Sequence, residues 1–367
     1  MPRVNRILAI NPGSTSTKIG LFEDESEIFK TSIEHPASLI AEFPTIEAQY
    51  EMRKEAVLAC LKGRDQDPAT LDALAARGGP LPQLAGGAYR VDAAMVDALR
   101  HGSLAEHVSN LAGIIAYDIG EARGIPSYIY DAISADELSE VARISGMPAI
   151  PRRSLCHVLN MRSVGRKVAQ GMGRAYGDVN LIVAHLGGGI SISLHRGGKM
   201  EDIVGDDEGP FSPERAGRVP CRALIDLCYS GEHDHQTMRR MLRGKGGLVA
   251  YAGTNDVVEM ETRIDSGNIE ASLLLEAMAY QVAKGIGELA TVVRGRVDRI
   301  VLTGGIARSK RIVSWIAERV GFIAPVEIVP GENELEALAF GVLRVLRGQE
   351  EARLYAPRTE AISEGKV

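Results

Sequence analysis

Three glycine-containing segments with polar side chains each follow a short apolar run. The first, NPGSTSTK at residues 11–18, combines one glycine, four hydroxyl side chains and one lysine. Backbone N–H groups, hydroxyls and an ammonium group that converge on one turn suit a phosphate. The GxxxxGK[ST] spacing of a Walker loop is absent. A phosphate site is therefore one interpretation of this turn, and a plain polar β-turn is the other.

The other two segments are HLGGGIS at residues 185–191 and LTGG at residues 302–305. Three consecutive glycines lose much backbone entropy on folding, so at a strand end they indicate close approach of a ligand or of another backbone segment. The pair Gly304–Gly305 alone is more typical of a structural turn. Three glycine-marked strand ends in one chain favour a nucleotide site over three unrelated turns.

Two arginines and two carboxylates stand next to these features. Arg77 precedes a Gly-Gly pair and Arg215 lies in SPERAGR. The planar guanidinium suits phosphate and carboxylate, although either arginine alone would more often form a surface ion pair. Asp131 ends the apolar run YIYD and Glu334 begins an apolar-periodic segment, so both are candidate magnesium ligands. The alternative for Glu334 is a charge that complements a helix dipole.

Two histidines, His107 in EHVSN and His157 in LCHVLN, lie in segments typical of helix starts or interiors. A lone histidine in such a place more often packs in the core with its hydrogen bonds satisfied than acts in catalysis. Residue type alone leaves both interpretations open.

The glycine turns require strands on either side of them. Apolar runs predict strands at 6–10, 19–22 and 28–33, and again at 181–184 and 192–195. An offset of 174 residues places His185 on Asn11 and Gly187 on Gly13, which suggests a duplicated architecture. The other predicted elements are helices at 46–61, 68–76, 92–99, 110–123, 275–293 and 334–346, and strands at 127–130, 300–303 and 326–329. This alternation indicates an α/β fold with mainly mixed sheets.

The composition bounds the function further. The 367 residues correspond to roughly two domains of about 150 residues each. The net charge of −6 argues against a general nucleic-acid binder, which needs a basic face. The four cysteines form no CxxC pair, so we expect no zinc knuckle and predict reduced, buried thiols in a cytoplasmic protein. Neither a secretory segment nor an apolar run of ~18 residues is recognised, so no membrane partner is expected.

The order of the motifs along the chain closely resembles the acetate and butyrate kinase family, and within it the butyrate kinases. The resemblance runs from about residue 6 to residue 348 and is weakest between residues 23 and 75. It is carried by the strings INPGSTSTK, RGG, EHVSNLAGIIA, YDAI, CHVLN, VAHLGGGIS, DEGPFSPERAG, GLVAYAGTND, AMAYQVAK, IVLTGGIA and PGENELEALA.

This resemblance implies the two-domain α/β fold of actin, Hsp70 and sugar kinases. Each domain would carry a βββαβαβα core, with a cleft between the domains. The first domain would span residues 1–150 together with a returning C-terminal helix at 334–350, and the second, nucleotide-binding domain residues 151–333. A homodimer or a larger even homo-oligomer is expected.

The resemblance also implies a reaction, in which ATP and butyrate give ADP and butyryl phosphate reversibly with Mg²⁺. A carboxylate is already a nucleophile near neutral pH, so the site must chiefly hold two anions in line and neutralise their charge. The implied catalytic positions are Arg77, His107, Asp131, His157 and Arg215. The implied phosphate- or substrate-binding positions are Asn11, Ser14, Ser16, Lys18 and Cys156. The implied nucleotide-binding positions are His185, Gly187, Gly188, Gly189, Gly304 and Gly305, and the implied metal ligands are Glu334 and Asp131.

Three departures from the family pattern bear on the substrate and the metal. Arg77 is followed directly by Gly78–Gly79, where acetate kinases carry two apolar residues and a histidine before the glycines. Cys156 precedes His157, where acetate kinases carry phenylalanine. Both differences remove bulk expected near the methyl end of the acid and favour a longer acyl chain. Leu335 follows Glu334 where many relatives have a second glutamate, which leaves Glu334 alone for the metal.

Other functions remain open from the sequence. Within the same reaction, the acid could be isobutyrate, propionate or acetate. A non-catalytic nucleotide-binding switch of this fold would keep the glycine turns without needing both arginines. A sugar kinase would need a base near the sugar hydroxyl and would leave Arg77 and Arg215 without a role.

Overall fold

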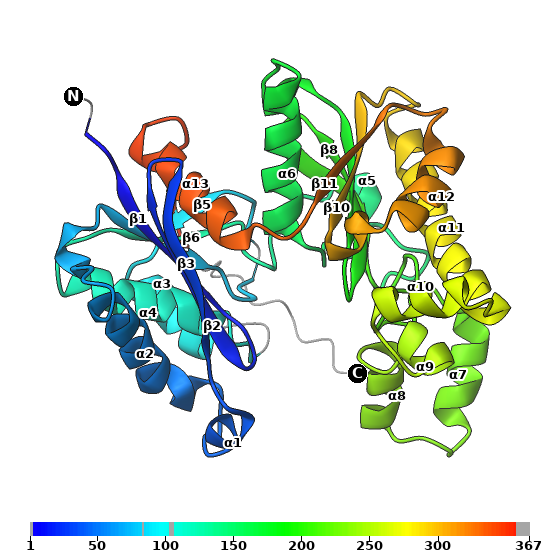
Figure 1. The fold of residues 1–367 in the computed structure, drawn as a ribbon, viewed down its shortest axis with the longest axis horizontal. Helices are drawn as coiled ribbons and strands as arrows, with labels where there is room; N and C mark the ends of the chain where they lie inside the picture. Colours follow the sequence, from blue (N-terminus) through cyan, green and yellow to red (C-terminus); the bar gives the residue numbers. More distant parts are fainter. Residues whose placement is uncertain (1–2, 83, 103–105, 357–367) are drawn as a thin grey trace. The chain divides into compact units, whose positions relative to one another are not determined.

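The chain forms two compact units in the computed structural model, which describes residues 3–82, 84–102 and 106–356 (Figure 1). The first unit runs to Asp136 and resumes at Asn333, and the second unit comprises Glu137–Glu332. The chain therefore passes between the units twice. The first of these passages comes earlier in the chain than the domain boundary expected at residue 150.

The first unit is built on a seven-stranded sheet in the order β12-β5-β6-β4-β1-β2-β3. Strands β1, β2 and β3 pair antiparallel, whereas β4 pairs parallel to β1 and to β6. Helices α2 and α4 cover one face of the sheet and α13 packs on the other (Figure 1). Its elements are β1 (Arg6–Pro12), β2 (Ser16–Glu23), β3 (Ser26–Glu34), α1 (Ala37–Ile40), η1 (Glu47–Gln49), α2 (Tyr50–Lys62), η2 (Pro68–Thr70), β4 (Ala73–Arg77), β5 (Ala88–Arg90), α3 (Ala93–His101), α4 (Asn110–Glu121), β6 (Ser127–Tyr130), α13 (Glu334–Leu346) and β12 (Arg353–Leu354).

One predicted element of the first unit is wrong. The helix expected over residues 68–76 is a 3₁₀ turn followed by strand β4. Alanine favours helices, and the segment LDALAAR is rich in it. In the fold, however, β4 lies between β1 and β6, and Ala73 to Ala76 are fully buried. A parallel strand buried on both faces is a continuous apolar run, which sequence periodicity does not separate from a helix.

The second unit is built on a five-stranded sheet in the order β11-β10-β7-β8-β9. Helix α6 packs against β7 and β10, and α11 packs against β7, β8 and β9 (Figure 1). The predicted apolar face from Leu275 to Val293 lies in this core. The elements are α5 (Glu140–Arg143), α6 (Val158–Gly171), η3 (Tyr176–Asp178), β7 (Leu181–Leu186), β8 (Ile190–Arg196), β9 (Lys199–Val204), α7 (Cys221–Tyr229), α8 (His235–Leu242), α9 (Leu248–Ala252), α10 (Val257–Asp265), α11 (Ile269–Val292), β10 (Arg299–Gly304), η4 (Gly305–Arg308), α12 (Lys310–Val320) and β11 (Val326–Pro330).

The two sheets repeat one strand order, which confirms the predicted duplication. The order β3-β2-β1-β4-β6 of the first sheet corresponds to β9-β8-β7-β10-β11 of the second. Shifted by the predicted 174 residues, the starts of β1, β2 and β3 fall within one residue of the starts of β7, β8 and β9. The glycine turn between the first two strands therefore has the same place in each unit.

In each unit, one helix that packs on the sheet follows, in the sequence, a strand of the other unit. Helix α6 follows β6 of the first unit in the sequence but packs on the second sheet, against β7 and β10. Helix α13 follows β11 of the second unit but packs on the first sheet, against β1 and β4. This exchange brings Glu334 to the first unit and His157 to the second.

Among the described residues, no helix is long and apolar enough to cross a membrane. All four cysteines are free thiols, but the expectation that they are buried is wrong. Cys60 and Cys156 are half-buried, whereas Cys221 and Cys228 are exposed on α7. Helix α7 buries none of its residues within this chain, so its thiols are not shielded by packing.

Candidate active site

Three of the predicted site residues meet at the carboxyl ends of β1 and β4 in the first unit. The Asn11 side-chain amide donates to Glu334 Oε2 at 2.6 Å, and the Arg77 guanidinium forms an ion pair with Glu334 Oε1. Arg77 Nε is buried without a hydrogen-bond partner among the residues described. The Arg77 side chain stays 21% exposed, and its planar guanidinium suits a phosphate or a carboxylate.

The Gly-Gly pair after Arg77 is required by packing inside the protein. A Cβ at Gly78 would lie 2.5 Å from the Cβ of Ala132, and a Cβ at Gly79 would lie 1.8 Å from Asn110 Oδ1. These contacts join the end of β4 to the start of α4 and to the segment after β6. The two glycines therefore let three motifs of the sequence pack closely, and Asn110 and Ala132 fill the space beside them.

Asp131 lies at the same edge of the sheet as Arg77, and His107 lies in the segment ahead of α4. Asp131 directly follows β6, is 2% exposed and has a left-handed φ of 43°. Its Oδ1 accepts the backbone N–H of Gly87 at 2.7 Å. His107 is exposed ahead of α4, and its Nδ1 accepts the backbone N–H of Ser109 at 3.1 Å. The metal role of Asp131 and the catalytic role of His107 stay predictions.

The NPGSTSTK segment forms the turn between β1 and β2. Ser14 and Lys18 are exposed and Ser16 is half-buried, so their polar side chains are accessible. The turn is closed by a 2.7 Å hydrogen bond from the Gly13 N–H to the Ser16 carbonyl. Accessible hydroxyls on a closed turn fit the predicted phosphate contact.

In the second unit, His157 and His185 come together although they are 28 positions apart. Their imidazole rings are stacked with 3.8 Å between centroids and 14° between planes. His157 Nδ1 lies 2.9 Å from Ser191 Oγ, and His185 Nδ1 lies 3.0 Å from Asn160 Oδ1. His185 is 1% exposed, while His157 is half-buried at the start of α6. The buried His185 ring therefore packs against the His157 ring, and His157 has the more accessible ring of the two.

Arg215 lies against the Gly187–Gly189 turn. A Cβ at Gly189 would lie 2.4 Å from Arg215 Cζ, so only glycine leaves room for this guanidinium. Arg215 Nη1 donates to Asp206 Oδ2 at 2.8 Å. Burial lowers the pKa of Arg215, and the neighbouring Asp206 opposes that shift. An arginine stays charged despite such a shift, so a cation lies directly beside a glycine-rich backbone turn.

The Gly304–Gly305 pair has a mixed explanation. Gly304 has φ of +89°, and a Cβ there would lie 2.3 Å from the Leu186 carbonyl oxygen, so close backbone packing requires this glycine. A Cβ at Gly305 would meet no atom of the described, non-adjacent residues within 4 Å, which leaves open space on that side. Of the two, Gly305 is the one whose surroundings leave room for a ligand.

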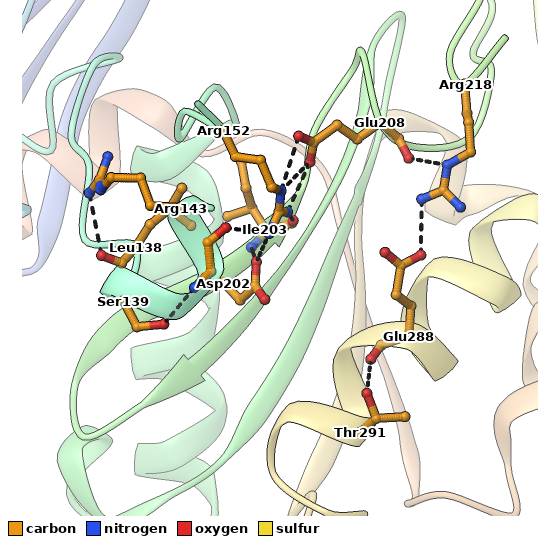
Figure 2. A network of polar contacts seen from close by, with 11 residues as sticks. Leu138, Ser139, Arg143, Arg152, Asp202, Ile203, Glu208, Arg218, Glu288 and Thr291 are labelled. Carbon is orange, nitrogen blue, oxygen red and sulfur yellow. Dashed lines mark hydrogen bonds and ion pairs between the residues drawn. The ribbon is translucent and has the colours of Figure 1, made fainter. Parts of the chain in front are cut away.

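Arg152, which sequence reasoning missed, anchors the segment that leads to His157. Arg152 binds the Glu208 carboxylate through Nε at 3.0 Å and through Nη2 at 2.9 Å, and Asp202 through Nη1 at 3.0 Å (Figure 2). It thereby ties the segment before His157 to β9 and to the loop that leads to Arg215. Hydrogen bonds from Arg152 to Glu208 raise the pKa of Arg152.

Cys156 is half-buried, and its Sγ lies 3.9 Å from Ser154 Oγ. It directly precedes His157, which is the N-cap residue of α6. A role in contacting the acyl chain stays a prediction.

The donor groups fit a metal ion that arrives with a nucleotide better than a permanent metal centre. Among the described residues, no three Asp, Glu, His or Cys side chains are grouped so as to hold a metal. Mg²⁺ commonly binds one or two carboxylates together with substrate phosphates and waters. Glu334, whose carboxylate contacts Asn11 and Arg77, could supply one such ligand.

Sequence reasoning also missed Arg53, Asn160, Ser191 and Asp206, which contact site residues. Asn160 and Ser191 stand inside the quoted strings CHVLN and HLGGGIS, so the motifs contained the signal. Asp206 and Arg53 stand among other charges, in GDDEG and YEMRKE, a pattern typical of solvent-facing residues. For these two only the fold reveals the contact.

Comparison with known proteins identifies the family and the fold of the chain. A sequence model of the acetokinase family matches residues 149–333, which is 185 of the 367 residues. The acetate kinase of Porphyromonas gingivalis has a similar structure, with a TM-score of 0.77 and 19% identity over 93% of this chain and 100% of that one. For the propionate kinase of Francisella tularensis the values are 0.71 and 18%, over 92% and 98%.

The acetate kinase of Entamoeba histolytica also has a similar structure, with a TM-score of 0.74 and 16% identity over 91% of this chain and 98% of that one. These likenesses show that the chain shares its fold with these kinases. The family match covers His157, the glycine turn at 187–189 and Arg215. The chain belongs to the acetokinase family of carboxylate kinases.

Proposed function

We propose that this chain transfers the γ-phosphoryl group of ATP to butyrate, giving butyryl phosphate and ADP in a reversible reaction. The observation that carries the proposal is the close contact between the Arg215 guanidinium and Gly189. This contact places a planar cation beside a glycine-rich turn that suits nucleotide phosphates. In the first unit, Arg77 supplies a second guanidinium, which forms an ion pair with Glu334.

In the proposed reaction a carboxylate oxygen of the acid attacks the γ-phosphorus, and the bond from that phosphorus to the bridging oxygen of ADP breaks. No proton has to move, because the acid is already ionised and ADP leaves as an anion. Arg77, Arg215 and His157 would neutralise the charge on the transferring group and hold it in line. Mg²⁺, held in part by Glu334, would add positive charge at the nucleotide phosphates.

The preference for butyrate rests chiefly on Cys156. The glycines after Arg77 carry no bulk, but Asn110 and Ala132 occupy the space that side chains there would take. That shortening therefore opens no room by itself. Cysteine in place of phenylalanine beside His157 removes an aromatic ring, and this difference supports a longer acyl chain.

The test is a hydroxylamine trap for acyl phosphates, run with ATP, Mg²⁺ and straight-chain and branched acids from acetate to hexanoate. We expect hydroxamate formation with butyrate at the highest kcat/KM. Hydroxamate with another acid at higher kcat/KM would keep the kinase and replace the substrate. A folded protein that yields no hydroxamate with any of these acids would overturn the proposed reaction.

A further inference from the structure

Arg53 of α2 forms hydrogen bonds to the backbone of the NPGSTSTK turn. Its side chain is buried, with 0% of the residue exposed. Nη1 donates to the carbonyl oxygens of Gly13 and Ser16, both at 3.0 Å, and Nη2 donates to the carbonyl oxygen of Ser14 at 2.9 Å. One guanidinium therefore binds three carbonyls of a single turn.

The remaining contacts of Arg53 are neutral. Nη1 donates to Thr17 Oγ1 at 3.1 Å, and Nε and Nη2 donate to Gln49 Oε1 at 3.1 and 2.9 Å. No carboxylate among the described residues forms a hydrogen bond or an ion pair with Arg53. Arg162, which is also buried, differs because it pairs with Glu137.

The hydrogen bonds from Arg53 to the three carbonyls fix the direction of the peptide dipoles in the turn. With three carbonyls directed at Arg53, the peptide dipoles of the turn have their positive ends facing away from the guanidinium. The backbone N–H groups of Ser14 and Thr15 donate to no other described residue, and both residues are exposed. Outward N–H groups on a turn form an anion-binding concavity.

We propose that Arg53 is a positioning residue for anion binding, which orients the 13–16 turn and places an uncompensated positive charge behind it. A purely structural anchor would work as well with a carboxylate beside it. A buried cation without one adds its field to that of the outward N–H groups, because a low-dielectric interior screens charge weakly. The ligand class is a phosphoryl group or inorganic phosphate.

His35 reports on the same charge. Its Nε2 lies 2.9 Å from Thr17 Oγ1, which Arg53 also binds. Burial, and in smaller part the charge of Arg53, lower the pKa of His35, while Glu34 acts in the opposite direction. Any change that neutralises Arg53 should therefore raise the pKa of this histidine.

The decisive variant is Gln49→Glu, which keeps the size and the hydrogen-bond acceptors of the side chain but adds a compensating negative charge next to Arg53. The matched control is Gln66→Glu. Gln66 Oε1 accepts from Arg6 Nη2 at 2.7 Å, so this control adds the same charge beside an arginine at the opposite end of β1. Binding of inorganic phosphate to the full chain is measured by calorimetry, beside the titration of His35 by NMR.

We expect Gln49→Glu to weaken phosphate binding by about tenfold and to raise the pKa of His35, and Gln66→Glu to do neither. Arg53→Lys should also weaken binding, because one ammonium cannot reach all three carbonyls. If Arg53→Lys fails to fold, the Gln49→Glu comparison decides alone. Unchanged phosphate affinity in a folded Gln49→Glu protein would overturn the proposal.

This inference rests on the proposed function only in taking the turn as a phosphoryl site. If the wild type forms no hydroxamate but binds phosphate in a manner that Gln49→Glu weakens, the reaction is wrong and the role of Arg53 stands. If the wild type is active and Gln49→Glu alters neither phosphate affinity nor kcat/KM, the role of Arg53 is wrong and the reaction stands. A wild type that binds no phosphate overturns the role of Arg53.

Discussion

The ring of His157 stacks on the buried ring of His185, with 3.8 Å between their centroids. Ser191 Oγ lies 2.9 Å from Nδ1 of the same ring. Stacking restrains one face of the His157 ring, and the contact with Ser191 restrains one of its nitrogens. The His185 ring itself is buried. This arrangement makes His185 a support for the ring that we expect to contact the transferring phosphoryl group.

His185→Ala should therefore lower kcat at saturating ATP by roughly 10-fold to 100-fold, because a loosened His157 loses its productive orientation. The KM for ATP should change much less. The control is His235→Ala, which removes an exposed ring from α8. A raised KM for ATP with unchanged kcat would instead show that His185 itself binds the nucleotide.

Arg215→Lys should lose most of kcat while the protein stays folded. Lysine keeps the charge but lacks the planar fork that reaches Asp206 and the glycine turn. We expect a loss on the order of 10²–10⁴-fold if Arg215 stabilises charge in the transition state. Arg218→Lys is the matched control, since Arg218 is half exposed and pairs with Glu288 (Figure 2). Near wild-type kcat and kcat/KM in Arg215→Lys would remove this residue from the site.

Cys156→Phe tests the acyl preference. A phenyl ring beside His157 should exclude the two distal methylenes of butyrate and leave room for acetate. Each methylene is worth ~0.8 kcal/mol, so the ratio of kcat/KM for butyrate over acetate should fall by about 15-fold. Cys228→Phe places the same ring on exposed α7 and should leave the ratio unchanged. The proposal that Cys156 lines the acyl pocket fails if both variants keep the wild-type ratio.

His195 should make the stability of the second unit depend on pH. Burial, reinforced by the charges of Arg162 and Arg166, lowers the pKa of His195 from 6.5 to about 3. Its ring nitrogens lie 2.6 Å from Tyr176 Oη and 2.6 Å from Ser193 Oγ. Between these pKa values the unfolded chain binds a proton that the folded chain does not. The stabilisation is therefore complete above about pH 6.5 and is lost as the pH falls toward about 3.

The free energy of unfolding should accordingly fall by up to ~1.4 kcal/mol per pH unit on acidification in this range. Urea titrations followed by hydrogen exchange at β8 measure it in the second unit. His195→Gln should flatten the pH dependence, whereas His101→Gln, at an exposed ring of α3, should not. Parallel curves for wild type and His195→Gln would contradict the assignment.

The glycine turns, their flanking strands and the repeat offset could be predicted from the sequence, because they depend on local pattern. Apolar runs that stop at glycines mark strand ends, and helix α13 covers the predicted residues 334–346. Strand β4 was out of reach, since an alanine-rich run buried on both faces has no period that separates it from a helix. The cysteines were likewise misjudged, because exposure is a property of packing and not of residue type.

The sequence by itself determined the family, the duplicated α/β pattern and the residue types that could bind phosphate and carboxylate. Only the tertiary structure decided which of them meet. Asn11, Arg77 and Glu334 are separated by up to 323 positions, and they meet because α13 returns to the first sheet. The contact of Arg53 with three carbonyls of the 13–16 turn was equally hidden. A buried arginine and an exposed one have the same letter, and burial arises only when distant segments pack.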